Sequence, residues 1–462
     1  MAEVYASIGT RSNIAIADGD SKLPSSASGS GTFASPYSLA YSSSPGDVGI
    51  GDKLAITDSN NYTGATFYYF VKSVSSNTVE VVFMYEDSGS YGKQNPTDLE
   101  VQDAYGDTEL AGHTYSRTYT TVVAWEAGLN NSNFYSANDD LTGWMHADSD
   151  FTEENVIFNY TATTYDSIKL TVNEDDRQHG IEGQTGKVVN KPNANPGGGT
   201  ASIYDLSIDN FTIEWIEIDM SSSTSTSCCI QTGTSNTQTK INAAIQNMMI
   251  HSWGTNQTAD PLNGILVRGG SGGYHHVFNC ICYDFQESDD HVTAFNMNQS
   301  RATVKCYNNT SYDMTVTVRT DKYASGFLWG TNGTINIKNC IAIDSINTQN
   351  SSSSLDFRRS AGSTDCDFCL SSDSTASTYG TNAQTSKTAA NTFEAGYPAS
   401  GLFIKSDSDA AGNGTDLGSE ANIDITEFDR NSVDVDWDIG AHQVTRTALS
   451  SSKPAFLMFL DI

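Results

Sequence analysis

Two polar turns in the middle of the chain carry the residue types that acid–base chemistry on a polysaccharide requires. They are Asp289, Asp290 and His291 in the first turn, and Arg319, Asp321 and Lys322 about 30 residues later. A uronate lyase needs a base that removes the proton beside a carboxyl group and a cation that stabilises the resulting charge. A glycoside hydrolase needs two carboxylates at a set separation. The spacing predicts that the two turns stack, which makes them the candidate catalytic site.

Other cationic side chains could contribute to the same chemistry, namely Arg268, His276, Arg358 and Arg359. Turns that face water are polar for that reason alone, however, and Asp is a common turn residue. This structural interpretation stands beside the catalytic one. No motif of a polysaccharide lyase or hydrolase matches residue by residue, so the sequence assigns no catalytic role.

An Asp closes several short β-type segments at regular intervals. Asp284, Asp313 and Asp344 form the centre of this column, with Asp219 before them and Asp373 after them. Stacked carboxylates could bind calcium, which takes several oxygen ligands. Alternatively, each Asp follows a strand and accepts backbone N–H groups within a turn. We expect no cofactor, and keep a structural calcium ion as the alternative.

The eight cysteines suit a buried core better than a disulfide framework, because the chain is long. Cys280 and Cys282 lie two residues apart in a predicted strand, so both point to the same face. Cys340 follows Cys280 by 60 residues, or about two repeats. Cys366 and Cys369 have CxxC spacing without a second such pair, which leaves zinc and a disulfide as minor alternatives to buried thiols.

One pattern repeats six times and must position all of these residues. Its copies close at residues 219, 251, 284, 313, 344 and 373, a period near 30. A repeat of this length with short β-type runs predicts a solenoid whose coils stack in parallel. The copies are EWIEID (Glu214–Asp219), QNMMIH (Gln246–His251), NCICYD (Asn279–Asp284), NNTSYD (Asn308–Asp313), NCIAID (Asn339–Asp344) and FCLSSD (Phe368–Asp373).

The rest of the chain divides around this repeat. A helix is predicted over Thr120–Ser132, where Trp125 lies on the apolar face, and it is placed to cover the first coil. The expected parts are an N-terminal arm (1–44), a small inserted β module (45–110), the capping helix and its connection (111–155), the parallel β-helix (156–445), and a tail that acts as a docking strand (446–462).

Composition and charge limit the classes of partner. The 462 residues include 38 Gly but 9 Pro, and 55 acidic against 24 basic residues give a formal net charge of −31. Such a field repels nucleic acid and anionic membranes. The start, MAEVYASIGTRS, lacks the pattern of a secretory signal, and the apolar run Ala455–Leu460 is too short to span a bilayer.

The last part of the chain resembles a broad group of proteins. WDIGAHQ (Trp437–Gln443) is similar to the DIGA-type terminator of right-handed parallel β-helix proteins in the pectate-lyase-like superfamily, which occur in phages and on bacterial surfaces. YASIGT and YTTVVAWEAG resemble the capping start of that group. The resemblance implies an all-β, single-stranded, right-handed parallel β-helix. We expect Trp437 and Ile439 to plug the last coil and Gly440 to allow a tight turn.

The resemblance is specific for fold and weak for function, because the group includes enzymes, adhesins and virion proteins. We expect a virion surface protein that assembles in the host cytoplasm: a phage head decoration, a vertex spike or a tail-associated fibre component. Its expected partners are its own copies, most simply as a trimer, other virion proteins, and host surface polysaccharide. The alternative is an extracellular or cell-surface enzyme, either a tailspike depolymerase or a polysaccharide lyase or hydrolase.

Overall fold

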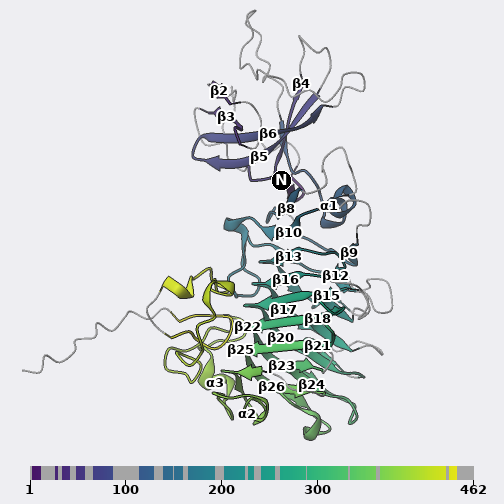
Figure 1. Ribbon diagram of the computed structural model, residues 1–462, viewed down its shortest axis with the longest axis vertical. Coiled ribbons are helices and arrows are strands. Elements are labelled where there is room, and N and C mark those ends of the chain that lie inside the picture. The colour runs from purple at the N-terminus through teal and green to yellow at the C-terminus, as the bar shows by residue number, and fades with distance from the viewer. Residues whose placement is uncertain are drawn as a thin grey trace, which may run out of the picture.

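The computed structural model is a parallel β-solenoid of about six turns, with ~31 residues per turn (Figure 1). This confirms the fold class that the repeat predicted. Strands make up 45% and helices 9% of the structure. The structure describes residues 3–11, 26–29, 34–41, 48–57, 66–86, 114–129, 139–148, 150–159, 165–192, 202–223, 227–233, 241–254, 261–287, 289–330, 333–360, 365–432 and 436–444.

The turns form three parallel sheets, which we call I, II and III, and a complete turn contributes one strand to each of them. Sheet I contains β1 (Glu3–Ile8), β8 (Asp140–Met145), β10 (Ser167–Val172), β13 (Phe211–Glu214), β16 (Ala243–Gln246), β19 (Tyr274–Phe278), β22 (Thr303–Tyr307), β25 (Thr334–Lys338) and β28 (Asp365–Asp367). Sheet II contains β11 (Val189–Asn190), β14 (Glu217–Asp219), β17 (Met249–Trp253), β20 (Ile281–Glu287), β23 (Thr310–Val316), β26 (Ile341–Asn347) and β29 (Leu370–Ser371). Sheet III contains β9 (Val156–Phe158), β12 (Ser202–Leu206), β15 (Cys228–Thr232), β18 (Leu262–Gly269), β21 (Val292–Ser300), β24 (Ala324–Trp329) and β27 (Phe357–Arg359).

A fourth, antiparallel sheet and a few short helices complete the structure. Sheet IV has the order β2 (Ser26–Ser28), β3 (Tyr37–Ala40), β6 (Thr78–Glu86), β5 (Thr66–Ser75), β4 (Lys53–Thr57) and β7 (Thr114–Ser116). The helices are α1 (Val122–Leu129), α2 (Thr375–Tyr379) and α3 (Ala389–Thr392), with 3-10 turns at η2 (Glu174–Asp176), η3 (Ser351–Ser353), η4 (Gly418–Glu420) and η5 (Arg430–Ser432). Among the described residues, no helix is long and apolar enough to cross a membrane.

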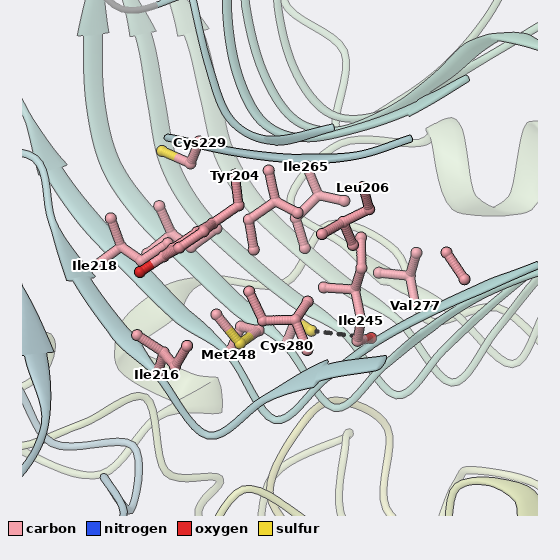
Figure 2. Close-up of a cluster of buried hydrophobic side chains, with 14 of the residues drawn as sticks. Tyr204, Leu206, Ile216, Ile218, Cys229, Ile245, Met248, Ile265, Val277 and Cys280 are labelled. Carbon is pink, nitrogen blue, oxygen red and sulfur yellow. Dashed lines mark hydrogen bonds between the residues drawn. The ribbon is translucent and has the colours of Figure 1, made fainter. Parts of the chain in front are cut away.

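Inward-facing side chains of the three sheets fill the solenoid. Figure 2 shows Tyr204, Ile245 and Cys280 among side chains that converge from different walls. Like side chains also stack along the axis, as in the phenylalanine column of β21, β24 and β27, where the ring centroids lie 4.8 and 5.0 Å apart. Burial of each such side chain stabilises the fold by roughly 1.5–3 kcal/mol. All eight cysteines, including Cys282 and Cys340, are buried free thiols, as the predicted strand pattern indicated.

Left-handed backbone positions form the corner between sheets I and II. Asn is well suited to a positive φ, because its short polar side chain tolerates this region better than most. Four successive turns use Asn at the corner, and a different residue occupies it at either end of the column. The residues are Trp215, Asn247, Asn279, Asn308, Asn339 and Phe368, with φ between 52° and 67°.

A second left-handed bend explains the predicted Asp column. Asp284, Asp313 and Asp344 have φ of 56°, 56° and 61° and lie opposite one another on neighbouring strands of sheet II. Ser252, with φ of 59°, occupies the same row one turn earlier. Asp219 is not in this row, because it pairs with His251. The predicted column was therefore wrong by one residue at its N-terminal end.

Helix α1 closes the N-terminal end of the solenoid, as predicted. Its residues Val122, Trp125 and Leu129 are buried in the solenoid core. The Trp125 ring packs edge-on against Phe158, with centroids 5.9 Å apart. Gly143 makes room for this ring, since a Cβ there would lie 2.9 Å from it. The apolar core is thus covered at the end where the first strands would otherwise leave it open.

Sheet IV interrupts the chain between two neighbouring strands of sheet I. Strands β1 and β8 pair in parallel, yet β2–β7 lie between them in sequence. The sheet has its own apolar core, which includes Leu54, Tyr69 and Val79. It begins at β2 and thus includes residues from the range expected to be an arm. Its contact with the solenoid includes the hydrogen bond from Ser7 N to Gly51 O (2.9 Å).

The C-terminal end of the solenoid is covered by residues 375–387. Ala376 of α2 lies in the solenoid core, and Tyr379 packs edge-on against Trp329. Backbone bonds from Phe368 N to Thr381 O (3.1 Å) and from Ser371 N to Gln384 O (2.8 Å) pair the last strands. A helix and a loop, rather than the terminator sequence, therefore close this end.

The terminator sequence packs along the outside of sheet II, which corrects the expectation that it plugs the last coil (Figure 1). Ile439 lies in an outer apolar cluster with Ile341, and Trp437 is 3% exposed beside Arg430. Gly440 has φ of +105° and approaches Ile341 so closely that a Cβ would lie 2.6 Å from its side chain. We call residues 389–444 the C-terminal lobe. The expected docking strand, 446–462, lies outside the described residues.

Part of this lobe runs back along the corner of sheets I and II. We call residues 415–427 the C-terminal strap. The four corner asparagines donate their amide hydrogens to strap carbonyls. The bonds are Asn339 to Thr415 O (2.8 Å), Asn308 to Ala421 O (3.1 Å), Asn279 to Ile423 O (2.7 Å) and Asn247 to Asp424 O (2.8 Å).

Asn339 has two roles in this arrangement, and substitutions can separate them. Its amide also accepts Thr415 N–H (2.9 Å), and its φ is 53°. We expect Asn339→Gly to lower the free energy of unfolding by about 1–3 kcal/mol through the lost hydrogen bonds. Asn339→Ala should cost about 1 kcal/mol more, because alanine also resists the left-handed backbone. Urea denaturation checks both values, and equal losses would contradict the backbone role.

Candidate functional site

The two predicted polar turns lie one above the other, as their spacing indicated. Lys322 Nζ contacts Asp290 Oδ1 at 2.9 Å across neighbouring turns. The ring of His291 stacks on Tyr323 with centroids 3.6 Å apart, and its Nδ1 accepts the Tyr323 N–H (2.9 Å). The guanidinium of Arg358 lies 4.2 Å from the Tyr323 ring centroid on the next turn. Cation, carboxylate and aromatic groups therefore form one column at this edge of sheet III.

The partners within this column favour a structural role. Lys322 neutralises Asp290, while Arg319 binds Asp321 of its own turn (3.1 Å), and both members of that pair are exposed. The backbone N–H of Asp289 donates to Glu287 Oε1 (2.9 Å). The side chains of Asp290, Arg319, Asp321 and Lys322 are therefore already paired with protein groups.

Burial lowers the pKa of His291 to about 4. The nearby charge of Asp290 acts in the opposite direction, whereas Lys322 and Arg358 lower the pKa further. The ring is therefore neutral near pH 7, and its Nδ1 is occupied as an acceptor. A neutral ring that is stacked and hydrogen-bonded is poorly placed to move a proton to or from a substrate.

The remaining basic candidates lie apart from this column. His276 is on the outer face of sheet I, where its ring stacks on Phe278 (5.0 Å). Arg268 is on sheet III, 3.4 Å from Gln231 Oε1. Arg359 lies 5.1 Å from the Tyr379 ring centroid near the C-terminal end. The structure brings only Arg358 of this group to the predicted turns.

The Asp row of sheet II is a set of mutually repelling carboxylates. Burial raises the pKa of Asp284 and of Asp344, and the charge of Asp313 between them raises both further. Among the described residues, no group of three or more His, Cys, Asp or Glu side chains is arranged to hold a metal ion. The calcium site stays a prediction.

A second polar cluster, which the sequence pattern did not predict, lies on the outer face of sheet II. His251 and Tyr283 occupy the same row of neighbouring strands, and their rings stack with centroids 5.2 Å apart. His251 Nε2 lies 3.0 Å from Glu217 Oε1, and both side chains are 1% exposed. Glu182 accepts the Tyr283 hydroxyl (3.1 Å) from a neighbouring loop. We call Glu182, Glu217, His251, Ser252 and Tyr283 the sheet II cluster.

A sequence signal for this cluster was present at one position. Most copies of the repeat end in Asp, whereas QNMMIH ends in His251. Strand β17 places Ile250 and Trp253 in the core, so His251 points outward. The contribution of Glu182 had no such signal, because it comes from a loop 35 residues before Glu217.

Two polar cavities lie beside the N-terminal turns of the solenoid. The larger, about 470 Å³, is adjacent to the sheet II cluster and is lined by Ala147, Asp148, Asp150, Gly183, Gln184, Thr185, Gly186, Lys187, Val189 and Lys191. The smaller, about 270 Å³, lies near sheet IV and is lined by Arg11, Val48, Arg117, His146, Ala147, Asp148, Asn173, Asp175 and Asp176. The predicted catalytic turns line neither of these cavities.

Comparison with known proteins does not assign the chain to a family. No protein-family model matches it, and no curated protein matches it. The parallel β-solenoid itself is established by the strand pairing. Membership of the pectate-lyase-like superfamily, and a phage origin, remain proposals.

One buried histidine inside the solenoid gives a pH-dependent prediction. His275 is 1% exposed, and neither ring nitrogen has a hydrogen-bond partner among the described residues. Burial lowers its pKa to about 4, and the charge of His276 adds to this. The unfolded chain, with a histidine pKa near 6.5, therefore takes up the proton first.

Stability of the folded state is therefore unaffected by His275 protonation above about pH 6.5, and the free energy of unfolding decreases as the pH falls from 6.5 toward 4. The free energy of unfolding should decrease between pH 7 and pH 4 in both proteins. We expect this decrease to be about 2–3 kcal/mol smaller in His275→Leu than in the wild-type protein. Denaturation at several pH values measures this difference. An identical pH dependence in both proteins would show that His275 does not contribute.

Proposed function

We propose that the chain is a structural protein of a virion surface, which acts by assembly and by binding through its sides. Closure of the solenoid at both ends is the observation that carries this proposal. Helix α1 covers one end of the core, and residues 375–387 cover the other. A closed solenoid does not extend by adding strands at its ends. Contacts with other proteins must then be made by the outer faces of sheets I, II and III, by the turns between them, or by sheet IV.

The division of the chain into two cores supports this function. Sheet IV has an apolar core separate from that of the solenoid. Such a unit can bind a particle while the solenoid extends away from it. Solenoids with long exposed walls commonly form symmetric oligomers, and we propose a homotrimer. Other virion proteins and host surface polysaccharide complete the proposed set of partners, with an extracellular or cell-surface location as the alternative.

Two measurements test this proposal. Purified particles should contain the chain after separation on a density gradient, and release by mild denaturant should return it to the soluble fraction. Sedimentation equilibrium of the purified protein should give three times the 49.7 kDa chain mass. Native protein that occurs as a free monomer outside any particle would overturn the proposal.

The second candidate is an enzyme that cleaves polysaccharides. It is favoured by the carboxylates of Glu182 and Glu217, which come from different segments and meet at His251 beside a polar cavity. Incubation with acidic and neutral polysaccharides should then release new reducing ends or unsaturated uronates. If neither product forms, this candidate is excluded for those substrates.

A further inference from the structure

Three side chains of the sheet II cluster form a continuous hydrogen-bonded chain. Ser252 Oγ lies 3.0 Å from His251 Nδ1, and His251 Nε2 lies 3.0 Å from Glu217 Oε1. A serine, a histidine and a carboxylate in this order are the components of a nucleophilic triad, which is recognised by geometry rather than by sequence order. The two ring nitrogens have exchanged the roles that they take in most serine hydrolases.

The surroundings of Glu217 determine which nitrogen of His251 carries the proton. Glu217 Oε1 also accepts the Gly183 N–H (3.0 Å), so it acts as an acceptor toward His251. The Nε2 atom of a neutral ring must then donate, which leaves Nδ1 as the acceptor for the Ser252 hydroxyl. The His251 ring is fixed by stacking on Tyr283, and the side chains of Glu217 and His251 are both buried, at 1% exposure.

Ser252 differs from its two buried partners in access and backbone conformation. It is partly exposed, and its φ of 59° places it at the left-handed bend of β17. The three turns that follow place Asp284, Asp313 and Asp344 at this bend, so serine differs from the residues after it in the row. A nucleophile on a sharp bend of a strand presents its hydroxyl outside the sheet. Ser252 is therefore partly open to solvent, whereas the side chains of His251 and Glu217 are buried.

We propose that Ser252, His251 and Glu217 hydrolyse carboxylic esters. Ser252 Oγ attacks the carbonyl carbon while its proton passes to His251 Nδ1. The tetrahedral intermediate then expels the alcohol, which takes that proton, and the acyl group stays on Oγ. Water attacks the acyl-enzyme, gives a proton to Nδ1, and releases the carboxylic acid as Ser252 recovers its hydrogen. Glu217 stabilises the imidazolium ion that forms twice in this cycle.

The charges around the triad limit the substrate. Glu182 lies 4.0 Å from His251 Nδ1. On the neighbouring strands of sheet II, Asp219 lies opposite His251 and Asp284 lies opposite Ser252. These carboxylates repel an anionic ester. Gly183, which donates its N–H to Glu217, and Lys191, which binds Asp219 (3.2 Å), both line the adjacent polar cavity of about 470 Å³. Its size suits a small hydroxylated molecule. The substrate class is therefore an O-acyl ester of a neutral alcohol such as a sugar.

Hydrolysis of 4-nitrophenyl acetate and of glucose pentaacetate by the full-length protein tests this proposal. Ser252→Gly keeps the left-handed backbone accessible, so the strand should stay folded while hydrolysis falls at least ~10³-fold. Glu217→Gln should reduce the rate ~10²–10⁴-fold. A fluorophosphonate should label Ser252, as mass spectrometry of the digested protein can show. The matched control, Ser360→Ala directly after β27 of sheet III, should retain full activity and labelling.

Two outcomes would overturn the inference. One is hydrolysis by the wild-type protein that equals that of Ser252→Gly. The other is a protein whose Ser252 stays unlabelled while its melting temperature is normal. Either result would make the cluster a structural hydrogen-bond chain. Neither bears on the proposed virion role, because particle association and oligomer mass are measured separately.

Discussion

Replacement of Arg430 by methionine is expected to lower the free energy of unfolding by about 3–5 kcal/mol. Arg430 is fully buried in the C-terminal lobe, where it donates to Gly440 O (2.8 Å) and to Gln443 Oε1 (3.0 Å). Burial lowers its pKa, whereas Asp424 and Asp438 act in the opposite direction. Methionine fills a similar volume but leaves those two carboxylates and the Gly440 carbonyl without their cation.

The effect should be confined to the lobe and the strap. Hydrogen exchange is expected to accelerate in residues 415–444, while the strands of sheets I and III keep their protection. Arg319→Met is the matched control, because Arg319 forms an exposed pair with Asp321 and its loss should not be resolved. Equal destabilisation by the two substitutions would contradict the role assigned to Arg430.

Replacement of Arg117 by methionine should produce a similar loss, about 3–5 kcal/mol, where sheet IV meets the solenoid. Arg117 Nη1 lies 2.6 Å from Asp52 Oδ1, and its Nε lies 2.6 Å from Asp148 Oδ2. Asp52 has no solvent exposure. Burial raises its pKa, and the charge of Arg117 acts against this shift. Without the guanidinium, Asp52 keeps the nearby His146 and the Gly49 N–H, but it loses its direct ion pair while it stays buried.

Acidification and a second substitution separate this charge effect from lost packing. The loss caused by Arg117→Met should be largest near neutral pH and should shrink as the pH falls, because a protonated Asp52 needs no cation. The double variant Arg117→Met with Asp52→Asn should recover part of the stability at pH 7. Thermal denaturation at pH 7 and pH 5 gives both comparisons. A loss that is the same at both pH values would point to packing alone.

The sequence predicted the parts of the fold that depend on local periodicity. Spacing near 30 gave the parallel solenoid, and the two-residue separation of Cys280 and Cys282 gave their inward direction. The predicted alignment of the Asp residues was wrong at Asp219. From Ser252 onward the strands of sheet II contain a left-handed bend, and the repeat pattern does not show that Asp219 lies one residue before this bend position. Positive φ at Asn and Asp positions was the physical reason for their recurrence.

Contacts between distant segments were not accessible in this way. Trp437 and Ile439 read equally well as a plug or as an outer layer, since both positions bury apolar side chains. The choice depends on the row of Asn side chains that bind the strap. The stacking of Asp290 over Lys322 followed from the repeat. The meeting of Glu182 with Glu217 and His251 depends on the path of one loop, which has no periodic signal.

The path of the strap has a mechanical consequence. In a solenoid each coil contacts its immediate neighbours, so a pull along the axis can unwind the coils one at a time. The strap is bonded to Asn247, Asn279, Asn308 and Asn339 on four successive turns. A tensile load is therefore shared across these turns, and several hydrogen bonds must break in shear before one coil separates. The force needed to separate the first of these turns is therefore higher than in a solenoid whose turns contact only their neighbours.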